Sequence, residues 1–294
     1  MLTLAWYTTI LLSVGAVSAG HAFAQAPRWP RRLTTLALIG AVALCVVVSA
    51  RLWSQTYDAF GGDQPLELVH AGVILFETSW GTGWLWQASA TTVTLLLVMA
   101  WRQRWSLWPL AAVAATVTAF TTALNGHAMA MEDRVWMTVT AHGLHVVAAA
   151  WWLGGLAAIQ AVTFGADLER DSQVRLSLSR VIDRFSPIAV AAVTLLVVAG
   201  GVATWRHVIE PAGVAGFASP YGLAVLGKVA AFGAAGLCGL YNWRVLRPQL
   251  AGSPEAARQL RGLAWLEVSL GVVALVLTAL LGTLSMPEPP GGGH

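Results

Sequence analysis

Residues 33–50 read LTTLALIGAVALCVVVSA, a run of eighteen residues without a charged side chain. A helix of this length and composition can cross the hydrocarbon layer of a membrane. No water is present there to satisfy an irregular backbone, so a helix is the form that such a segment takes. The run therefore predicts a membrane-spanning helix.

Seven further apolar runs lie on either side of this one. The predicted spans are residues 3–26, 33–53, 84–101, 108–125, 136–161, 187–207, 220–243 and 262–284. Tryptophans lie near the ends of most of them, as expected for an aromatic belt at the membrane interfaces. We therefore predict an all-α fold, in which residues 1–294 form a single polytopic membrane domain of about eight transmembrane helices.

The composition excludes several classes of protein. Of the 294 residues, 57% are hydrophobic and 11% are charged, whereas a soluble domain carries about 25% charged residues. Eight spans use nearly the whole chain, which leaves no soluble catalytic domain, and we expect no enzyme activity. Lys228 is the single lysine, and the arginines stand at the ends of apolar runs. The net charge of +3 therefore indicates membrane orientation and not nucleic-acid binding.

The arginines are divided unequally between the two sets of loops. Thirteen belong to one set: Arg28, Arg31, Arg32, Arg102, Arg104, Arg170, Arg175, Arg180, Arg184, Arg244, Arg247, Arg258 and Arg261. The opposite loops hold Arg51, Arg134 and Arg206 together with half of the 14 acidic residues, which are Asp58, Asp63, Glu67, Glu77, Glu132, Asp133 and Glu210. Because positively charged loops stay inside, both termini are predicted to lie outside.

Two connections are longer than turns. Residues 54–83, on the outside, contain apolar residues that are consistent with a short helix at the membrane interface. Residues 165–184, on the inside, mix acids and arginines at helical spacing, which favours a solvated helical connector. The chain thus divides into a four-span N-terminal part, residues 1–119, and the region that follows.

Histidine and methionine gather beside the fifth span. His127, Met129 and Met131 lie in the loop before it, and His142 and His145 lie in its outer half. Imidazole and thioether together suit copper, as Cu⁺ or Cu²⁺, better than other common ions. His142 and His145 are three residues apart, so they share one helix face and lie about 4.5 Å apart along its axis. The loop methionines could instead pack at the interface, and the histidines could bond a neighbouring helix.

Other polar residues of the spans and loops are weaker candidates. His70 and His207, in outer loops, are possible additional metal ligands, and His294 follows a glycine run. Lys228 and Glu267 lie within the seventh and eighth spans, and Asn242 lies at the end of the seventh. Either a Lys228 to Glu267 ion pair or a Glu267 to Asn242 hydrogen bond would stabilise helix packing, so we interpret these three residues as structural. Cys45 and Cys238 are interpreted as inert packing residues.

Several ordered motifs resemble the CopD-type copper resistance protein family. They are Gly126-His127-Ala128, His142-Gly-Leu-His145, Trp152-Leu-Gly154-Gly155-Leu156, Arg184-Phe185-Ser186, Pro220-Tyr221-Gly222 with Lys228, Asn242-Trp-Arg244 with Pro248, and Glu267. The resemblance is good over residues 120–287. Earlier in the chain it is limited to the span count and to Thr78, Gly81 and Trp84, and Gln87 stands where the family is expected to have an arginine.

The resemblance implies a multi-pass protein of the bacterial inner membrane that handles copper. The outside, where the arginines predict that both termini lie, is then the periplasm. The resemblance also implies that His127, His142 and His145 are the family's histidines, and that a periplasmic CopC-type copper-binding protein is a partner besides membrane lipid. The leading hypothesis is a copper permease. A haem-binding electron-transfer protein is an alternative, because membrane histidines on separate helices can ligate haem iron. A receptor or storage protein that binds copper without moving it is the third possibility.

Overall fold

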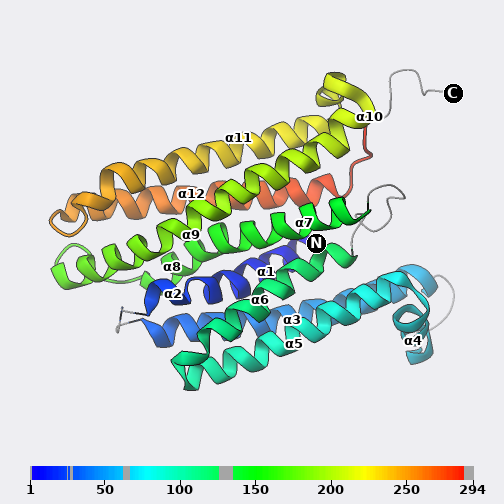
Figure 1. Ribbon diagram of the computed structural model, residues 1–294, viewed down its shortest axis with the longest axis horizontal. Coiled ribbons are helices and arrows are strands. Elements are labelled where there is room, and N and C mark those ends of the chain that lie inside the picture. Colours follow the sequence, from blue (N-terminus) through cyan, green and yellow to red (C-terminus); the bar gives the residue numbers. More distant parts are fainter. Residues whose placement is uncertain (1, 25, 27–28, 62–66, 126–134, 288–294) are drawn as a thin grey trace.

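The computed structural model describes residues 2–24, 26, 29–61, 67–125 and 135–287, in which every regular element is a helix (Figure 1). The α-helices are α1 (Leu2–Ser18), α2 (Gly20–Phe23), α3 (Pro30–Phe60), α4 (Leu68–Glu77), α5 (Ser79–Gln103), α6 (Trp108–Thr121), α7 (Val135–Ala149), α8 (Gly155–Thr163), α9 (Ser172–Thr204), α10 (Glu210–Ala212), α11 (Pro220–Tyr241) and α12 (Pro254–Leu281). Short 3₁₀ turns are η1 (Trp105–Leu107), η2 (Thr122–Asn125), η6 (Gly213–Ala218) and η8 (Arg247–Gln249).

In the described part of the chain, three π-helical segments interrupt the long helices. They are η4 (Ala150–Gly154), η5 (Trp205–Ile209) and η7 (Asn242–Leu246). Such segments often accompany functional sites in helices. His207 lies in η5 and Asn242 lies in η7, and η4 begins five residues after His145. Two of these segments therefore contain a polar residue that the sequence singles out, and the third follows the helix that carries His142 and His145.

Among the described residues, eight helical runs are long and apolar enough to cross a membrane, which confirms the predicted number of spans. The runs lie side by side along the long axis of the molecule (Figure 1). The start of α1, the end of α12 and α4 lie toward one end of this bundle, and the α2–α3, α5–α6, α8–α9 and α11–α12 connections lie at the other. The protein is therefore a polytopic helical membrane protein.

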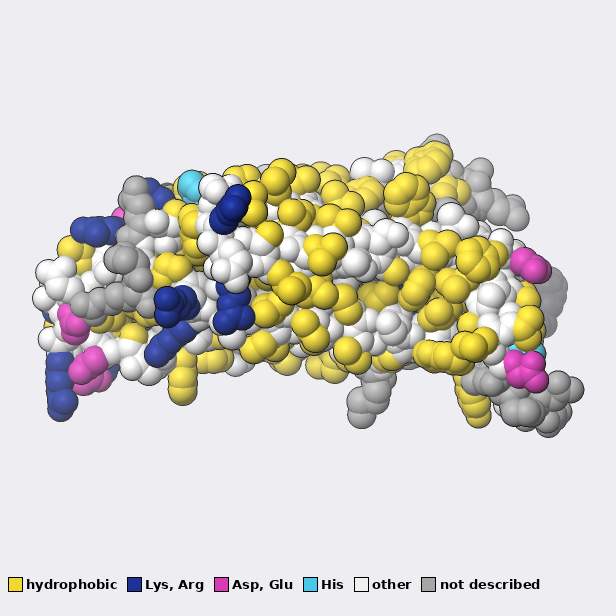
Figure 2. All heavy atoms as spheres, turned by 90° about the horizontal axis from the view of Figure 1, so that it is seen from below, with side chains coloured by type: hydrophobic (Ala, Val, Ile, Leu, Met, Phe, Trp, Pro, Cys, Tyr) yellow, Lys and Arg dark blue, Asp and Glu magenta, His cyan; other side chains and the backbone are white. Residues whose placement is uncertain are grey.

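Side chains of different kinds occupy different zones along the bundle. On the face shown in Figure 2, apolar side chains cover the middle, and Lys and Arg side chains gather at the end opposite the two chain termini. We call this the arginine end and the opposite end the terminal end. The arginine-rich set of loops in the sequence thus corresponds to one end of the bundle.

Helix α1 is the central element of the bundle. It packs against α3, α6, α8, η4 and α12, and most of its inner residues are buried. Its closest crossing is with η4, where a Cβ atom at Gly15 would come within 2.1 Å of the backbone of Gly154. Two glycines at this point permit the backbones to touch, as small residues do in membrane bundles. The crossing joins the N-terminal half of the bundle to the helix that carries His142 and His145.

Side-chain caps mark where several helices begin. Thr78, Asp171, Ser219 and Ser253 each accept a hydrogen bond from a backbone N–H of the first turn of α5, α9, α11 or α12. Proline occupies the first helical position after Ser219 and Ser253, where its missing N–H costs nothing. These caps explain why α5, α9 and α12 start before the predicted apolar runs.

The predicted boundaries were wrong in places. The sixth span, expected at 187–207, belongs to a helix that begins at Ser172, because Asp171 caps it there and the charged stretch continues the same helix. Arg51 was assigned to an outer loop but lies inside α3, which extends to Phe60. Arg206, assigned to another outer loop, is buried in η5 and pairs with Glu210. A short helix, α4, is present within residues 54–83 as predicted.

Candidate metal-transfer site

The histidines of the fifth span lie on α7, which packs against α6 and α9. His142 and His145 are both half-buried. The ring of His145 faces Gly200 of α9, where an added Cβ atom would lie 3.6 Å from its Cε1. Its Nδ1 atom is buried without a hydrogen-bond partner among the described residues. An imidazole nitrogen inside the bundle is therefore free to act as an acceptor or a ligand.

Two residues of other helices lie near this pair. Lys228 of α11 is close enough to act electrostatically on both His142 and His145, and His207 of η5 acts on His142 in the same way. The distances of these residues from the starts of their helices agree with this proximity. His142 and His145 lie about 10 and 15 Å from the start of α7, and Lys228 lies about 12 Å from the start of α11. We call His142, His145, His207 and Lys228 the histidine cluster.

The tautomer of His207 follows from its contact with the backbone of Ala203. Its Nδ1 lies 2.7 Å from the carbonyl oxygen of Ala203. A carbonyl only accepts, so Nδ1 carries a proton, and in the neutral ring Nε2 then has the lone pair. This is the tautomer in which a histidine can bind a metal through Nε2. The sequence placed His207 in an outer loop as a possible ligand; the structure places it within electrostatic reach of His142.

The remaining predicted ligands cannot be placed with the cluster. His127, Met129 and Met131 lie within residues 126–134, outside the described residues. Among the residues that the structure does describe, no three His, Cys, Asp or Glu side chains form a group that could hold a metal ion. The described part of the site thus offers a pair of imidazoles and a nearby third, and not a closed set of ligands.

His70 belongs to a different environment. Its Nδ1 accepts a hydrogen bond of 3.1 Å from the backbone N–H of Glu67, and Glu67 caps the same turn of α4 in return. Its ring stacks on Phe60, with 4.8 Å between the ring centroids. These contacts give His70 a local role in starting α4, which packs against α3 and α5. His70 is not brought to the histidine cluster.

A second intramembrane polar contact joins α11 to α12. Asn242 donates a hydrogen bond of 2.6 Å to Glu267, whose side chain is 3% exposed. Gly239 makes room for the carboxyl group, because a Cβ atom there would lie 3.1 Å from Glu267 Oε2. Of the two arrangements that the sequence allowed, the structure has this hydrogen bond and no ion pair between Lys228 and Glu267.

Sequence reasoning missed a buried polar network in the N-terminal half. Gln87 is completely buried, and its Oε1 accepts hydrogen bonds from Arg51 at 3.3 Å and from Asn125 at 2.8 Å. The guanidinium of Arg51 also lies over the Trp6 ring, 3.5 Å from its centroid. Asn125 directly precedes residues 126–134 along the chain. Gln87, at a position where an arginine was expected, was a sequence signal of an unusual polar site, but its partners Arg51 and Asn125 could not be predicted from the sequence.

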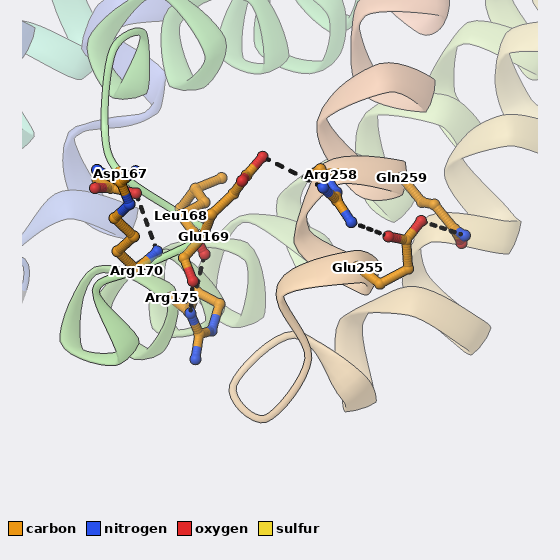
Figure 3. Close-up of polar contacts among 8 residues, drawn as sticks. All are labelled: Asp167, Leu168, Glu169, Arg170, Arg175, Glu255, Arg258 and Gln259. Atoms are coloured by element: carbon orange, nitrogen blue, oxygen red, sulfur yellow. Dashed lines mark hydrogen bonds and ion pairs between the residues drawn. The ribbon is translucent and has the colours of Figure 1, made fainter.

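The arginine end carries a different kind of chemistry (Figure 3). Arg258 of α12 contacts Glu169 of the α8–α9 connection at 3.7 Å and pairs with Glu255, and the side chain of Arg175 donates to the carbonyl oxygens of Leu168 and Glu169. A pocket of about 180 Å³ lies beside these contacts. Its polar groups are carboxylates and guanidiniums, which are poor ligands for a soft ion. The contact between Arg258 and Glu169 links α12 to the segment between α8 and α9.

Comparisons with known proteins agree with the motifs. Residues 1–137 match the model of the N-terminal domain of copper resistance protein D-like proteins, and residues 179–281 match the model of copper resistance protein D. The first range includes His127, Met129 and Met131, the second includes His207, Lys228, Asn242 and Glu267, and His142 and His145 lie between the two.

One relative extends the similarity across most of the chain. Copper resistance protein D of Pseudomonas syringae pv. tomato is 32% identical over 270 residues, which cover 88% of this chain and 84% of that protein. No solved structure gives a significant match. The chain belongs to the copper resistance protein D family, and its function is related to copper.

Proposed function

We propose that this protein is a copper permease of the bacterial inner membrane and not an enzyme. Copper, the transported substrate, would be received at the terminal end by His127, Met129 and Met131 and passed inward by His142 and His145. We further propose that a periplasmic CopC-type copper-binding protein delivers it. Family membership supports the link to copper, and the geometry of α7 supports movement through the bundle.

The free nitrogen of His145 is the observation that carries this proposal. A buried polar atom without a partner costs about 1–3 kcal/mol. Polar and ionisable residues in membrane spans are rare and usually mark a pathway for ions or substrates. Nδ1 of His145 is such an atom, one helical turn further along α7 than His142. Two imidazoles at successive depths on one helix face suit an ion that moves from one to the next.

The neighbouring lysine favours passage over storage. A permeating ion must bind well enough to enter and weakly enough to leave. Lys228 acts electrostatically on both His142 and His145, so a positive charge there would repel a cation held between the two rings. A storage site would instead be expected to have carboxylate or thiolate ligands. The cluster therefore suits a transient copper site.

The haem alternative has one observation in its favour. His142 and His145 share a helix face and cannot be the two axial ligands of one haem. His207 belongs to a different helical segment and lies near His142, so a pair from separate helices exists. A haem ligated by such a pair would give the purified protein a Soret absorption band, whereas a copper permease would not.

Copper uptake into proteoliposomes tests the proposed function. The full-length protein should increase copper entry over protein-free vesicles, and His145→Ala should remove most of this increase. His70→Ala is the matched control, because it removes an imidazole that caps α4 outside the histidine cluster. Copper binding without uptake would identify a receptor or storage protein. A Soret band that disappears in His142→Ala would support electron transfer instead.

A further inference from the structure

A groove at the arginine end lies between the two halves of the bundle. It has a volume of about 570 Å³, and its walls come from the start of α3 and the end of α8. The residues that line it are Arg31, Arg32, Thr35, Leu36, Ile39, Ala161, Val162 and Phe164. Helix α3 belongs to the N-terminal half and α8 to the C-terminal half, so a ligand in this groove would contact both.

Two adjacent arginines form the polar part of the groove. Arg31 is exposed, and no hydrogen bond or ion pair joins its side chain to another described residue. Arg32 is held in place, because its Nη1 donates to the carbonyl oxygens of Val162 and Phe164, each at 3.3 Å. The other guanidinium nitrogens of Arg32 remain available. The groove therefore presents two positive charges without a carboxylate among its lining residues.

The rest of the groove is an apolar wall that leads away from the arginines. Leu36 and Ile39 follow Arg32 at four and seven residues, which places all three on one face of α3. Ile39 lies about 10 Å along the helix from Arg32, toward the apolar middle of the bundle. Ile39 is 61% exposed and Phe164 is 69% exposed, which is expected for side chains that face lipid. An acyl chain could lie along this wall while a headgroup contacts the arginines.

We propose that this groove binds an anionic phospholipid, with its phosphate between Arg31 and Arg32 and an acyl chain along Leu36 and Ile39. Charge complementarity selects an anionic headgroup, and the continuous apolar wall selects a lipid over a soluble anion. The location agrees with this occupant, because the arginine end is predicted to face the cytoplasm, where anionic lipid headgroups attract basic residues. The lipid would link α3 to α8. This inference does not depend on copper transport.

Thermal unfolding of the detergent-purified protein tests the proposal. A ligand that binds the native state raises the melting temperature by an amount that grows with the logarithm of its concentration divided by Kd, so a titration gives an apparent Kd. Phosphatidylglycerol should raise the melting temperature, whereas phosphatidylcholine and inorganic phosphate should not. Each arginine near an anionic headgroup contributes about 5-fold in affinity, so Arg31→Gln should weaken phosphatidylglycerol binding about 5-fold and the Arg31→Gln/Arg32→Gln pair about 30-fold.

Two further variants separate this site from general attraction to the arginine end. Arg102→Gln/Arg104→Gln removes two exposed arginines at the end of α5, outside the groove, and should leave the affinity unchanged. Ile39→Trp should fill part of the groove beside the apolar wall and weaken phosphatidylglycerol binding without a change in charge. Equal losses of phosphatidylglycerol affinity in the Arg31→Gln/Arg32→Gln and Arg102→Gln/Arg104→Gln variants would overturn the proposal. So would stabilisation by inorganic phosphate alone, or an Ile39→Trp variant that binds phosphatidylglycerol as the wild type does.

Discussion

Gly200 of α9 faces the imidazole ring of His145 on α7. A Cβ atom added to Gly200 would lie 3.6 Å from Cε1 and 3.8 Å from Nδ1 of His145, which is ordinary van der Waals contact. A Cβ atom added to the adjacent Gly201 would have no neighbour within 4 Å. The size of the residue at position 200 therefore controls the space beside the unpartnered nitrogen of His145.

This relationship gives a graded prediction for copper binding. Gly200→Ala should leave the affinity nearly unchanged, whereas Gly200→Leu should displace the His145 ring and weaken binding about 10-fold, as loss of an orienting contact commonly does. Gly201→Leu is the matched control, since it adds the same side chain in open space. Copper titration of the three purified variants is the measurement. Equal weakening in both leucine variants would show that a leucine disturbs α9 in general.

Copper binding should be more sensitive to replacement of the histidines themselves than to changes at position 200. His142→Ala and His145→Ala should each weaken copper binding about 10-fold or more, because each removes a ligand. Cys45→Ala should have no effect, since Cys45 is a free, half-buried thiol on α3. Metal analysis after purification measures this directly. If both histidine variants keep the copper content of the wild type, the intramembrane site is ruled out.

Much of the fold could be predicted from the sequence because the membrane imposes it. Eight apolar runs predicted eight spans, and the described residues form eight such helical runs. Residues 165–184 were predicted to contain a helical connector, but hydropathy reports where a segment is apolar and not where its helix ends, so the continuity of this helix from Ser172 into the sixth span was missed. The π-helical segments were also missed, because a change of backbone hydrogen-bond register has no clear residue signature.

The candidate site could be predicted only in part. The spacing of His142 and His145 placed them on one face of one helix, since that relationship is local. The positions of His207 and Lys228 beside them depend on how α9 and α11 pack, which spacing along the chain does not report. The same limit applies to Arg51 and Gln87, which are 36 residues apart in sequence and hydrogen-bonded in space.

The contact between Asn242 and Glu267 should contribute to stability. Asn242→Ala would leave the buried carboxyl group of Glu267 without its donor, which should cost about 1–3 kcal/mol of unfolding free energy. Ser269→Ala is a suitable control on α12, because the exposed Ser269 bonds only to the carbonyl of Trp265 in its own helix. Denaturant unfolding in detergent compares the two. An Asn242→Ala variant as stable as the control would show that the contact contributes little.

The orientation of the bundle remains a prediction from the arginines. A reporter fused after His294 should behave as periplasmic, and one inserted between Arg170 and Ser172 should behave as cytoplasmic, since positively charged loops stay inside. Alkaline phosphatase and a fluorescent protein report the two compartments. A cytoplasmic C-terminus would contradict the proposed path, because the terminal end of the bundle would then face the wrong compartment for copper delivered from the periplasm.

The methionines near His127 should determine which copper ion is preferred. Thioether sulfur is soft and uncharged, so Met129 and Met131 should favour Cu⁺ over Cu²⁺, whereas imidazole accepts both. The Met129→Leu/Met131→Leu variant keeps the apolar character of both positions and removes only the sulfur atoms. We expect it to bind Cu²⁺ as the wild type does and to lose affinity for Cu⁺. Parallel titrations with the two ions measure this, with Met137→Leu on α7 as the control. An unchanged preference would mean that Met129 and Met131 serve only for packing at the interface.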